Sequence, residues 1–225
     1  MRPYNPPTDP HLSVIYVDDA LLVLDKPSGL LTVPGRDPAH RDSLASRAQG
    51  AYADALIVHR LDMDTSGLVV MARGADIHRK LSALFQQRAV DKTYLARVWG
   101  EPAQDSGEVD LPLICDWPNR PRQMVDFEVG KPSLTRWRKL STDGNTTLLE
   151  LTPVTGRSHQ LRVHMQAMGH PILGDPFYAH AEALAAAPRL LLHAQELGFV
   201  HPVLESPLHF LCNAGPEFHP GSGAG

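Results

Sequence analysis

Short β-type runs, rich in apolar and β-branched residues, recur along the chain and predict a strand-rich protein. Residues 13–17 and 21–25 are two such runs, and the polar pair Asp18-Asp19 between them predicts a hairpin turn. Residues 68–72 form a continuous apolar run that is typical of a buried strand. Further strands are expected over residues 92–99, 123–129, 133–140, 146–152, 190–199 and 208–211.

Helical periodicity is confined to a few segments. Residues 76–87 place four apolar side chains on one helical face, namely Ile77, Leu81, Leu84 and Phe85. Helices are also expected over residues 43–53 and 158–168, the latter beginning near Gly156. Strands and helices do not alternate regularly, so the order favours a mixed α+β sheet over a Rossmann or barrel plan.

The chain has 225 residues, enough for one large domain or two small ones. We expect one folded domain over residues 13–212, between a loose N-terminal segment (1–12) and a flexible Gly-rich tail (213–225). No stretch of 18 apolar residues and no secretory signal is present. Cys115 and Cys212 are far apart, which favours reduced thiols in a cytoplasmic protein that does not span a membrane.

The net charge of −4 argues mildly against a nucleic-acid partner, because affinity for phosphate comes mainly from Lys and Arg. The charges are unevenly distributed, however. Residues 117–139 contain six basic residues and two acids, and residues 60–100 contain seven basic residues and four acids. Charge alone therefore leaves two interpretations open, a basic binding face and an ordinary solvated surface of mixed charge.

The densest polar cluster is the segment from His59 to Gly67, which lies between apolar, strand-like residues. Catalytic groups are often placed on loops held between strands, and a carboxylate beside an arginine suits a nucleophile or base. Asp62 is such a carboxylate. The alternative is a turn in which Asp64, Thr65 and Ser66 bond their own backbone.

A second polar cluster runs from Gly156 to His164. On a helix, residues 158 and 162 share one face and residues 160 and 164 share another. Arg162 and Gln160 would then point in different directions, one into a site and one along its rim. A helix start with solvated basic residues is the alternative.

Two other kinds of site gain little support. Asp64-Thr65-Ser66-Gly67 resembles the Asp-Thr-Gly signature of aspartic proteases, but its glycine is one place late and no second copy supplies a dyad. The twelve histidines include no zinc-binding His-Glu-x-x-His pair, and no Gly-rich nucleotide motif is present. The sequence therefore predicts neither a metal site nor a cofactor.

Several motifs, taken together and in order, resemble those of the RluA-type pseudouridine synthases. The resemblance runs from about residue 12 to residue 212, nearly the whole chain. The motifs are Asp25-Lys26-Pro27-Ser28-Gly29-Leu30, His59-Arg60-Leu61-Asp62-x-x-Thr65-Ser66-Gly67, Lys92-x-Tyr94-x-Ala96-x-Val98-x-Gly100, Gly156-Arg157-Ser158-His159-Gln160-Leu161-Arg162, Gly169-His170-Pro171-Ile172-Leu173-Gly174-Asp175 and Leu191-Leu192-His193-Ala194.

The resemblance implies an enzyme that isomerises chosen uridines in RNA without a cofactor. It implies a largely antiparallel mixed sheet with a central RNA-binding cleft, and no additional S4 RNA-binding domain. Asp62 would be the catalytic carboxylate, attacking ribose C1′ or acting through a glycal route. Arg162 would pair with Asp62, and Tyr94 would lie against the uracil of a flipped nucleotide.

Given an RNA substrate, the distribution of basic residues suggests a hypothesis for where it binds. Arg60 would fill the gap left by the flipped base or contact a phosphate, and the 117–139 stretch with Arg79, Lys80 and Arg88 would follow the phosphates. Further RNA-contacting residues would be His59, Thr65, Arg120, Arg122, Arg157, His159 and Gln160.

Residues 110–121 and the opening Tyr4-Asn5-Pro6-Pro7 are similar to a dual-specificity member of the family, which implies uridines in large-subunit ribosomal RNA and in a tRNA anticodon stem-loop. The expected protein is a monomer. Three alternatives remain: the same chemistry on another RNA, an RNA-binding or chaperone protein without catalysis, and a hydrolase that pairs Asp62 with Asp64.

Overall fold

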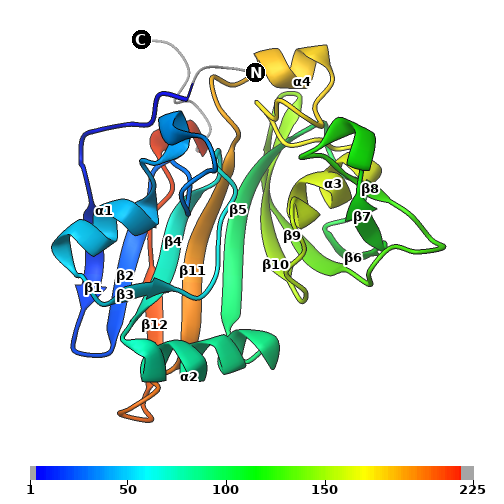
Figure 1. Cartoon of the computed structure of the whole chain (residues 1–225). Coiled ribbons are helices and arrows are strands. Elements are labelled where there is room, and N and C mark those ends of the chain that lie inside the picture. The colour runs from blue at the N-terminus through cyan, green and yellow to red at the C-terminus, as the bar shows by residue number, and fades with distance from the viewer. Residues whose placement is uncertain (1–3, 219–225) are drawn as a thin grey trace. The chain divides into compact units, whose positions relative to one another are not determined.

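A computed structural model describes residues 4–218 of the chain. These residues form two compact units (Figure 1). The first unit contains the residues up to Lys92 and Ala194–Asn213, and the second contains Thr93–His193 and the residues from Ala214 onward. Strands β5 (Asp91–Trp99) and β11 (Leu192–Val200) each begin in one unit and end in the other.

The first unit is built on a sheet whose strands follow the order β1-β2-β4-β11, with β12 beside β11 and β3 beside β4. The pairings β1–β2, β2–β4, β3–β4 and β11–β12 are antiparallel. Every residue of β4 except the last is buried, which explains its continuous apolar sequence. The remaining strand bounds are β1 Ser13–Val17, β2 Leu21–Lys26, β3 Ala55–Ile57, β4 Ser66–Arg73 and β12 Pro207–Leu211.

Two helices complete the first unit. Helix α1 (Leu44–Ala51) begins with a capping box, in which the Ser43 and Ser46 side chains each accept a hydrogen bond from the other residue's backbone N–H. Helix α2 (Ala75–Gln86) packs against β4 and crosses one end of the sheet (Figure 1). Its apolar face is the predicted one, with Leu81 buried and Ile77, Leu84 and Phe85 packed around it.

The second unit contains a sheet of order β5-β10-β9-β6, in which all pairings are antiparallel. Helix α3 (Gln160–Ala167) lies against β9 and β10. Its buried Leu161 and Met165 join the core that Leu149 and Leu151 of β10 form. The other bounds are β6 Ser106–Asp110, β9 Leu134–Asp143, β10 Thr146–Pro153 and α4 Ala181–Ala185. The expected α+β fold with a largely antiparallel sheet is confirmed.

Strands β7 (Leu113–Cys115) and β8 (Gln123–Val125) pair only with each other and form a separate ribbon. The predicted strand over residues 123–129 is therefore wrong beyond Val125. Asp126 ends it, because its carboxylate accepts hydrogen bonds from the backbone of Glu128 and Val129 and bends the chain into a turn. The sequence also did not reveal β3, β6, β7 or α4.

The described parts of the two terminal segments have contacts of their own. The Tyr4 hydroxyl donates to Asp42 O at 2.7 Å and accepts from Leu31 N at 3.1 Å. At the other end, Phe218 is buried and its carbonyl accepts from Arg97 Nη1 at 3.1 Å. The expected tail thus starts with an anchored turn, and residues 219–225 lie outside the described residues. Within residues 4–218, no helix is long and apolar enough to cross a membrane.

Candidate active site

Asp62 lies on the loop of residues 58–65, which joins β3 to β4 and is here called the Asp62 loop. Lys26 supports this loop from a fully buried position, with 0% exposure. Its ammonium group donates to Met63 O at 2.9 Å, Pro27 O at 2.9 Å and Leu30 O at 2.7 Å. The carbonyl oxygens thus take the place of the water molecules that would solvate the ammonium charge of Lys26 at the surface.

The residues after Lys26 hold the neighbouring carbonyls of the same loop. The Thr32 hydroxyl donates to Leu61 O at 2.8 Å, and it accepts from Leu61 N at 3.2 Å. The Ser28 hydroxyl donates to Asp64 O at 2.7 Å. The backbone on both sides of Asp62 is therefore fixed, which is the requirement for aiming a catalytic carboxylate.

Gly67 lets the loop return to the sheet. Its φ is 106°, a value that side-chain-bearing residues rarely adopt, and a Cβ at this position would collide with the backbone of Ala194. The glycine of the His59–Gly67 motif is thus required by a close backbone approach.

His59 and Thr65 of the motif are turned into the protein. The His59 ring stacks on Phe85, and its Nε2 accepts a hydrogen bond from Val70 N at 3.0 Å. Burial, together with the nearby charge of Lys92, lowers the pKa of His59 from 6.5 to about 3. His59 is therefore neutral at physiological pH. Thr65 is buried, Asp62 is partly buried and Arg60 is exposed.

In the second unit, Arg162 of α3 forms a buried two-point ion pair with Asp175. Its Nε donates to Oδ2 at 2.8 Å and its Nη2 donates to Oδ1 at 2.7 Å. The two side chains are 2% and 0% exposed. Two parallel charge-assisted hydrogen bonds fix the plane of the guanidinium as well as its position.

Aromatic rings enclose the same guanidinium. Arg162 Cζ lies 5.3 Å from the centre of the Phe177 ring and 5.2 Å from that of Tyr178. The Asp175 carboxylate also accepts from the backbone N–H groups of Phe177 and Tyr178, at 2.9 and 3.2 Å. Asp175 therefore orients Arg162 and the two aromatic residues together. A Cβ on Gly174, whose φ is 69°, would collide with the carbonyl of Arg189.

Helix α3 starts two residues later than predicted, because His159 has a left-handed backbone with φ 52°. Gln160 is buried and caps the preceding turn. Its amide oxygen accepts from Thr155 Oγ1 at 2.7 Å and Arg157 N at 3.0 Å, and its amide nitrogen donates to Leu134 O at 2.9 Å. Arg162 and Gln160 do differ in direction, but both are buried.

The other predicted residues of the second unit lie at several levels of exposure. Tyr94 is partly buried on β5, where it packs against the core. His159 Nδ1 is 2.6 Å from the Tyr178 hydroxyl, and its ring stacks against Phe177. Arg157 is exposed.

The basic stretch 117–139 divides into two halves. Its C-terminal half lies on β9 and is neutralised: Arg136 pairs with Glu108, Arg138 with Glu150, and Lys139 with Glu101 and Asp105. Among residues 4–218, its N-terminal half (Arg120, Arg122, Lys131) forms no ion pair. The basic residues of this stretch that form no ion pair therefore lie on and around the β7–β8 ribbon, on the same segment as Asp126 and Glu128.

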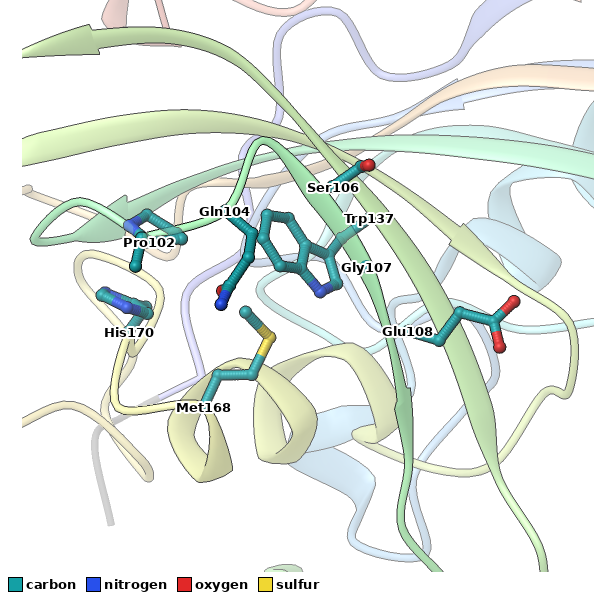
Figure 2. A pocket seen from close by; sticks show the side chains of 9 residues that line it. Pro102, Gln104, Ser106, Gly107, Glu108, Trp137, Met168 and His170 are labelled. Atoms are coloured by element: carbon teal, nitrogen blue, oxygen red, sulfur yellow. The ribbon is translucent and has the colours of Figure 1, made fainter.

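Two open hollows lie in the second unit. One, of about 530 Å³, contains none of the predicted site residues. Figure 2 shows Met168, Gln104 and Trp137 gathered in it, with the Glu108 carboxylate pointing away from His170. The other, of about 490 Å³, borders Arg122, Phe177 and Tyr178 and so adjoins the surroundings of Arg162. No group of three or more His, Cys, Asp or Glu residues suited to a metal ion occurs in the described part of the chain.

Sequence reasoning missed the residues that hold the candidate groups in place. Lys26 and Asp175 were both quoted as motif residues, but nothing in their local pattern showed that they are buried. Tyr178, whose hydroxyl accepts from Gln123 N at 2.8 Å, has no sequence signal beyond its proximity to Asp175. The structure assembles His59–Thr65 in the first unit and Arg162, Asp175 and Tyr178 in the second.

Comparison with known proteins identifies the class. The family model described as RNA pseudouridylate synthase matches residues 20–167. The chain therefore belongs to this family of RNA-modifying isomerases, which confirms the resemblance drawn from its motifs.

Similar relatives within the family carry the name dual-specificity RNA pseudouridine synthase RluA. The Yersinia pestis protein is 55% identical over 202 residues, covering 89% of this chain and 98% of the relative. The protein of Escherichia coli strain K12 is 54% identical over 211 residues, covering 93% and 96%.

Solved structures agree with this assignment. Human RNA pseudouridylate synthase domain containing 1 has a TM-score of 0.76 and 26% identity, covering 96% of this chain and 89% of that one. Human RNA pseudouridylate synthase domain containing 4 has a TM-score of 0.73 and 27% identity, covering 92% and 90%.

Proposed function

We propose that this protein converts specific uridines in structured RNA to pseudouridine, with Asp62 as the nucleophile and no cofactor. The glycosidic bond between ribose C1′ and uracil N1 breaks, the base turns, and C1′ joins uracil C5, which loses its hydrogen as a proton. The observation that carries the proposal is the clamped Asp62 loop, in which side chains from Lys26, Ser28 and Thr32 hold the carbonyls around one carboxylate.

Asp62, Tyr94 and Arg162 act on the same uridine in this proposal. Arg162 pairs with Asp62 and aims it, and Asp175 supports the role by fixing the plane of the guanidinium. Tyr94 presents an aromatic face to the flipped base. Asp62 attacks C1′ or acts through a glycal, and both routes require the same ionised, oriented carboxylate.

The RNA-binding set divides according to exposure. Arg60, exposed beside the catalytic residue, fills the gap left by the flipped base. Arg120, Arg122, Lys131 and the exposed Arg157 follow the phosphates, and His159 borders them. We assign the inward-facing His59 and Thr65 to holding the Asp62 loop, and Gln160 to holding the turn before α3, because their side chains are turned into the protein.

A matched pair of variants tests the phosphate contacts. Arg120→Gln removes a charge without an ion pair, and Arg136→Gln removes one that pairs with Glu108 at 2.7 Å. We expect Arg120→Gln to weaken binding to every RNA and to reduce the slope of log K against log[salt] by about 1. Arg136→Gln should change neither quantity much. Equal effects of the two variants would contradict the assignment.

The substrate part of the proposal is dual: uridines in large-subunit ribosomal RNA and in a tRNA anticodon stem-loop. The names of the relatives support it, because they are dual-specificity enzymes that cover nearly the whole chain. A short loop whose bases unstack cheaply is a substrate that both RNAs can present. We further propose that the protein acts as a monomer in the cytoplasm.

Tritium release is the direct test. RNA labelled with tritium at uracil C5 loses the label to water when C5 joins C1′. A tRNA mixture and a ribosomal RNA transcript are incubated in parallel with the wild type and with Asp62→Asn. Release by the wild type alone is expected from both RNAs. Release from one RNA refutes dual specificity, release by Asp62→Asn refutes its role, and release from neither refutes the proposal.

A further inference from the structure

The segment from Leu113 to Lys131, which contains the β7–β8 ribbon, exposes several large apolar side chains. Trp117 is 67% exposed and Phe127 is 77% exposed, and Met124 and Val129 lie on the same segment. Several apolar groups of this size exposed to water on one short segment suggest an interaction site. The segment is an excursion from the second unit, closed at its base where Leu113 and Lys131 bridge.

Hydrogen bonds hold the backbone of the turn that carries Trp117. Asp116 N donates to Arg122 O at 2.9 Å and closes the turn. The Asn119 side-chain amide donates to both Asp116 carboxylate oxygens, at 3.1 and 2.9 Å. Pro118 restricts the backbone between them. Binding of a partner to Trp117 therefore costs little conformational entropy in the backbone of this turn.

The chemistry around the indole favours a nucleobase. Arg120 Cζ lies 3.9 Å from the centre of the Trp117 ring system, so a guanidinium already stacks there. The excursion also carries Asp116, Asp126 and Glu128, of which Asp116 accepts from Asn119 and Asp126 from backbone N–H groups. Its other basic residues, Arg122 and Lys131, form no ion pair within residues 4–218. A partner that offers a flat π-face together with negative charge fits this surface, and an unpaired nucleotide has both.

The turn is also linked to the surroundings of Arg162. Gln123 N donates to the Tyr178 hydroxyl at 2.8 Å, and Arg122 Cζ lies 5.5 Å from the centre of the Tyr178 ring. The Tyr178 ring in turn lies 5.2 Å from Arg162 Cζ. An RNA loop whose uridine reaches Arg162 consequently leads its neighbouring nucleotides toward the ribbon.

We propose that Trp117, backed by Arg120, is a stacking platform for an unpaired base next to the target uridine in the RNA loop. This inference rests on the proposed function and adds a contact that selects single-stranded loops over duplexes, because only an unstacked base offers its face.

Binding of an RNA stem-loop to Trp117→Ala, made in the Asp62→Asn background to prevent turnover, tests the platform. Loss of one base–aromatic stack should weaken binding by about tenfold, and Trp117→Phe should restore most of the affinity. The loss should be much smaller for a blunt duplex of the same length. Leu204→Ala is the matched control, because Leu204 is 68% exposed but lies in the first unit.

Fluorescence gives a second readout. The chain has three tryptophans, and Trp137 is only 6% exposed, whereas Trp117 is 67% exposed. A base stacked on the indole should quench its emission, so RNA should quench the Asp62→Asn protein strongly and its Trp117→Phe derivative weakly. Equal quenching of the two proteins would overturn the platform.

The two proposals fail in different ways. If the wild type releases tritium but Trp117→Ala binds RNA with unchanged affinity, the platform is wrong and the proposed function stands; a patch for a protein partner would give this result. If the wild type neither releases tritium nor binds either RNA, both are wrong. Tenfold weaker binding of Trp117→Ala, restored by phenylalanine, supports the platform.

Discussion

Replacing Asp175 by asparagine removes one charge from the buried pair with Arg162 and leaves the size of the side chain unchanged. The amide oxygen can still accept from the backbone of Phe177 and Tyr178, as Oδ1 does at 2.9 and 3.2 Å. The amide nitrogen then faces Arg162 Nε, which now donates to Oδ2 at 2.8 Å. Two donors oppose each other, and the guanidinium loses the negative charge of Asp175.

The structure sets the size of the effect. Both side chains are almost completely buried, at 2% and 0% exposure, so water cannot replace the missing carboxylate. Removing one partner of such a pair costs about 3–5 kcal/mol of unfolding free energy. The Arg136–Glu108 pair has the same 2.7 Å separation but is 61% and 53% exposed, so Glu108→Gln should cost less than about 1 kcal/mol.

Urea unfolding measures the stability of both variants, and tritium release measures their activity. If Asp175 positions Arg162 for catalysis, kcat should fall by about 100-fold in Asp175→Asn, the scale on which misplacement of a catalytic group by 1 Å acts. RNA affinity of the folded variant should stay near that of the wild type. Glu108→Gln should retain kcat.

Two outcomes would refute this reasoning. A loss of stability below about 1 kcal/mol would mean that the buried pair contributes no more to the free energy of unfolding than an exposed pair. A large loss of stability with unchanged kcat in the remaining folded protein would make Asp175 purely structural. A fall in kcat without a change in affinity is the result that a structural role alone does not produce.

Three further predictions concern the Asp62 loop. Lys26→Met should lower the free energy of unfolding, measured in urea, by at least about 2 kcal/mol. The carbonyls of Pro27 and Leu30 lose their buried donor, whereas Met63 O still accepts from Gly29 N. A variant as stable as the wild type would contradict this. Gly67→Ala should yield little folded protein by circular dichroism, whereas Gly50→Ala, with no heavy atom within 4 Å of the added Cβ, should fold normally. In the unfolded chain, His59 gains a proton below pH 6.5, whereas the folded ring, with a pKa of about 3, does not. The free energy of unfolding should therefore fall by about 2 kcal/mol between pH 7 and 5. His59→Gln should remove this decrease, and the control His209→Gln should not.

Local pattern was sufficient wherever an element buries one face over several residues. Helix α2 and its apolar face were predicted within a residue or two, as were the strands β4 and β10. Pattern failed on the three-residue strands β3 and β7, which are too short for alternation to be read. It also failed after Val125, where the Asp126 side chain overrides a sequence that otherwise looks extended.

The charge pattern shows a different limit. Arg136 and Arg138 look like part of a basic patch because cross-strand neighbours are invisible along the chain. In the sheet, Arg136 pairs with Glu108 on β6 and Arg138 with Glu150 on β10, each set by strand register. Sequence counting therefore overstated the size of the basic patch.

The motifs of the candidate site could be predicted from the sequence, but the buried residues that hold its side chains in place could not. Asp62 and Arg162 were found because they lie in dense polar clusters, whereas Lys26 and Asp175 act from 37 and 13 residues away on Met63 and Arg162. Both supporting residues are buried and charged, and such groups rarely add net stability compared with an apolar core. Their burial beside the Asp62 loop and beside the helix that carries Arg162 is therefore better explained by orientation of these groups than by folding. The kcat of Asp175→Asn, measured beside its stability, separates these two explanations.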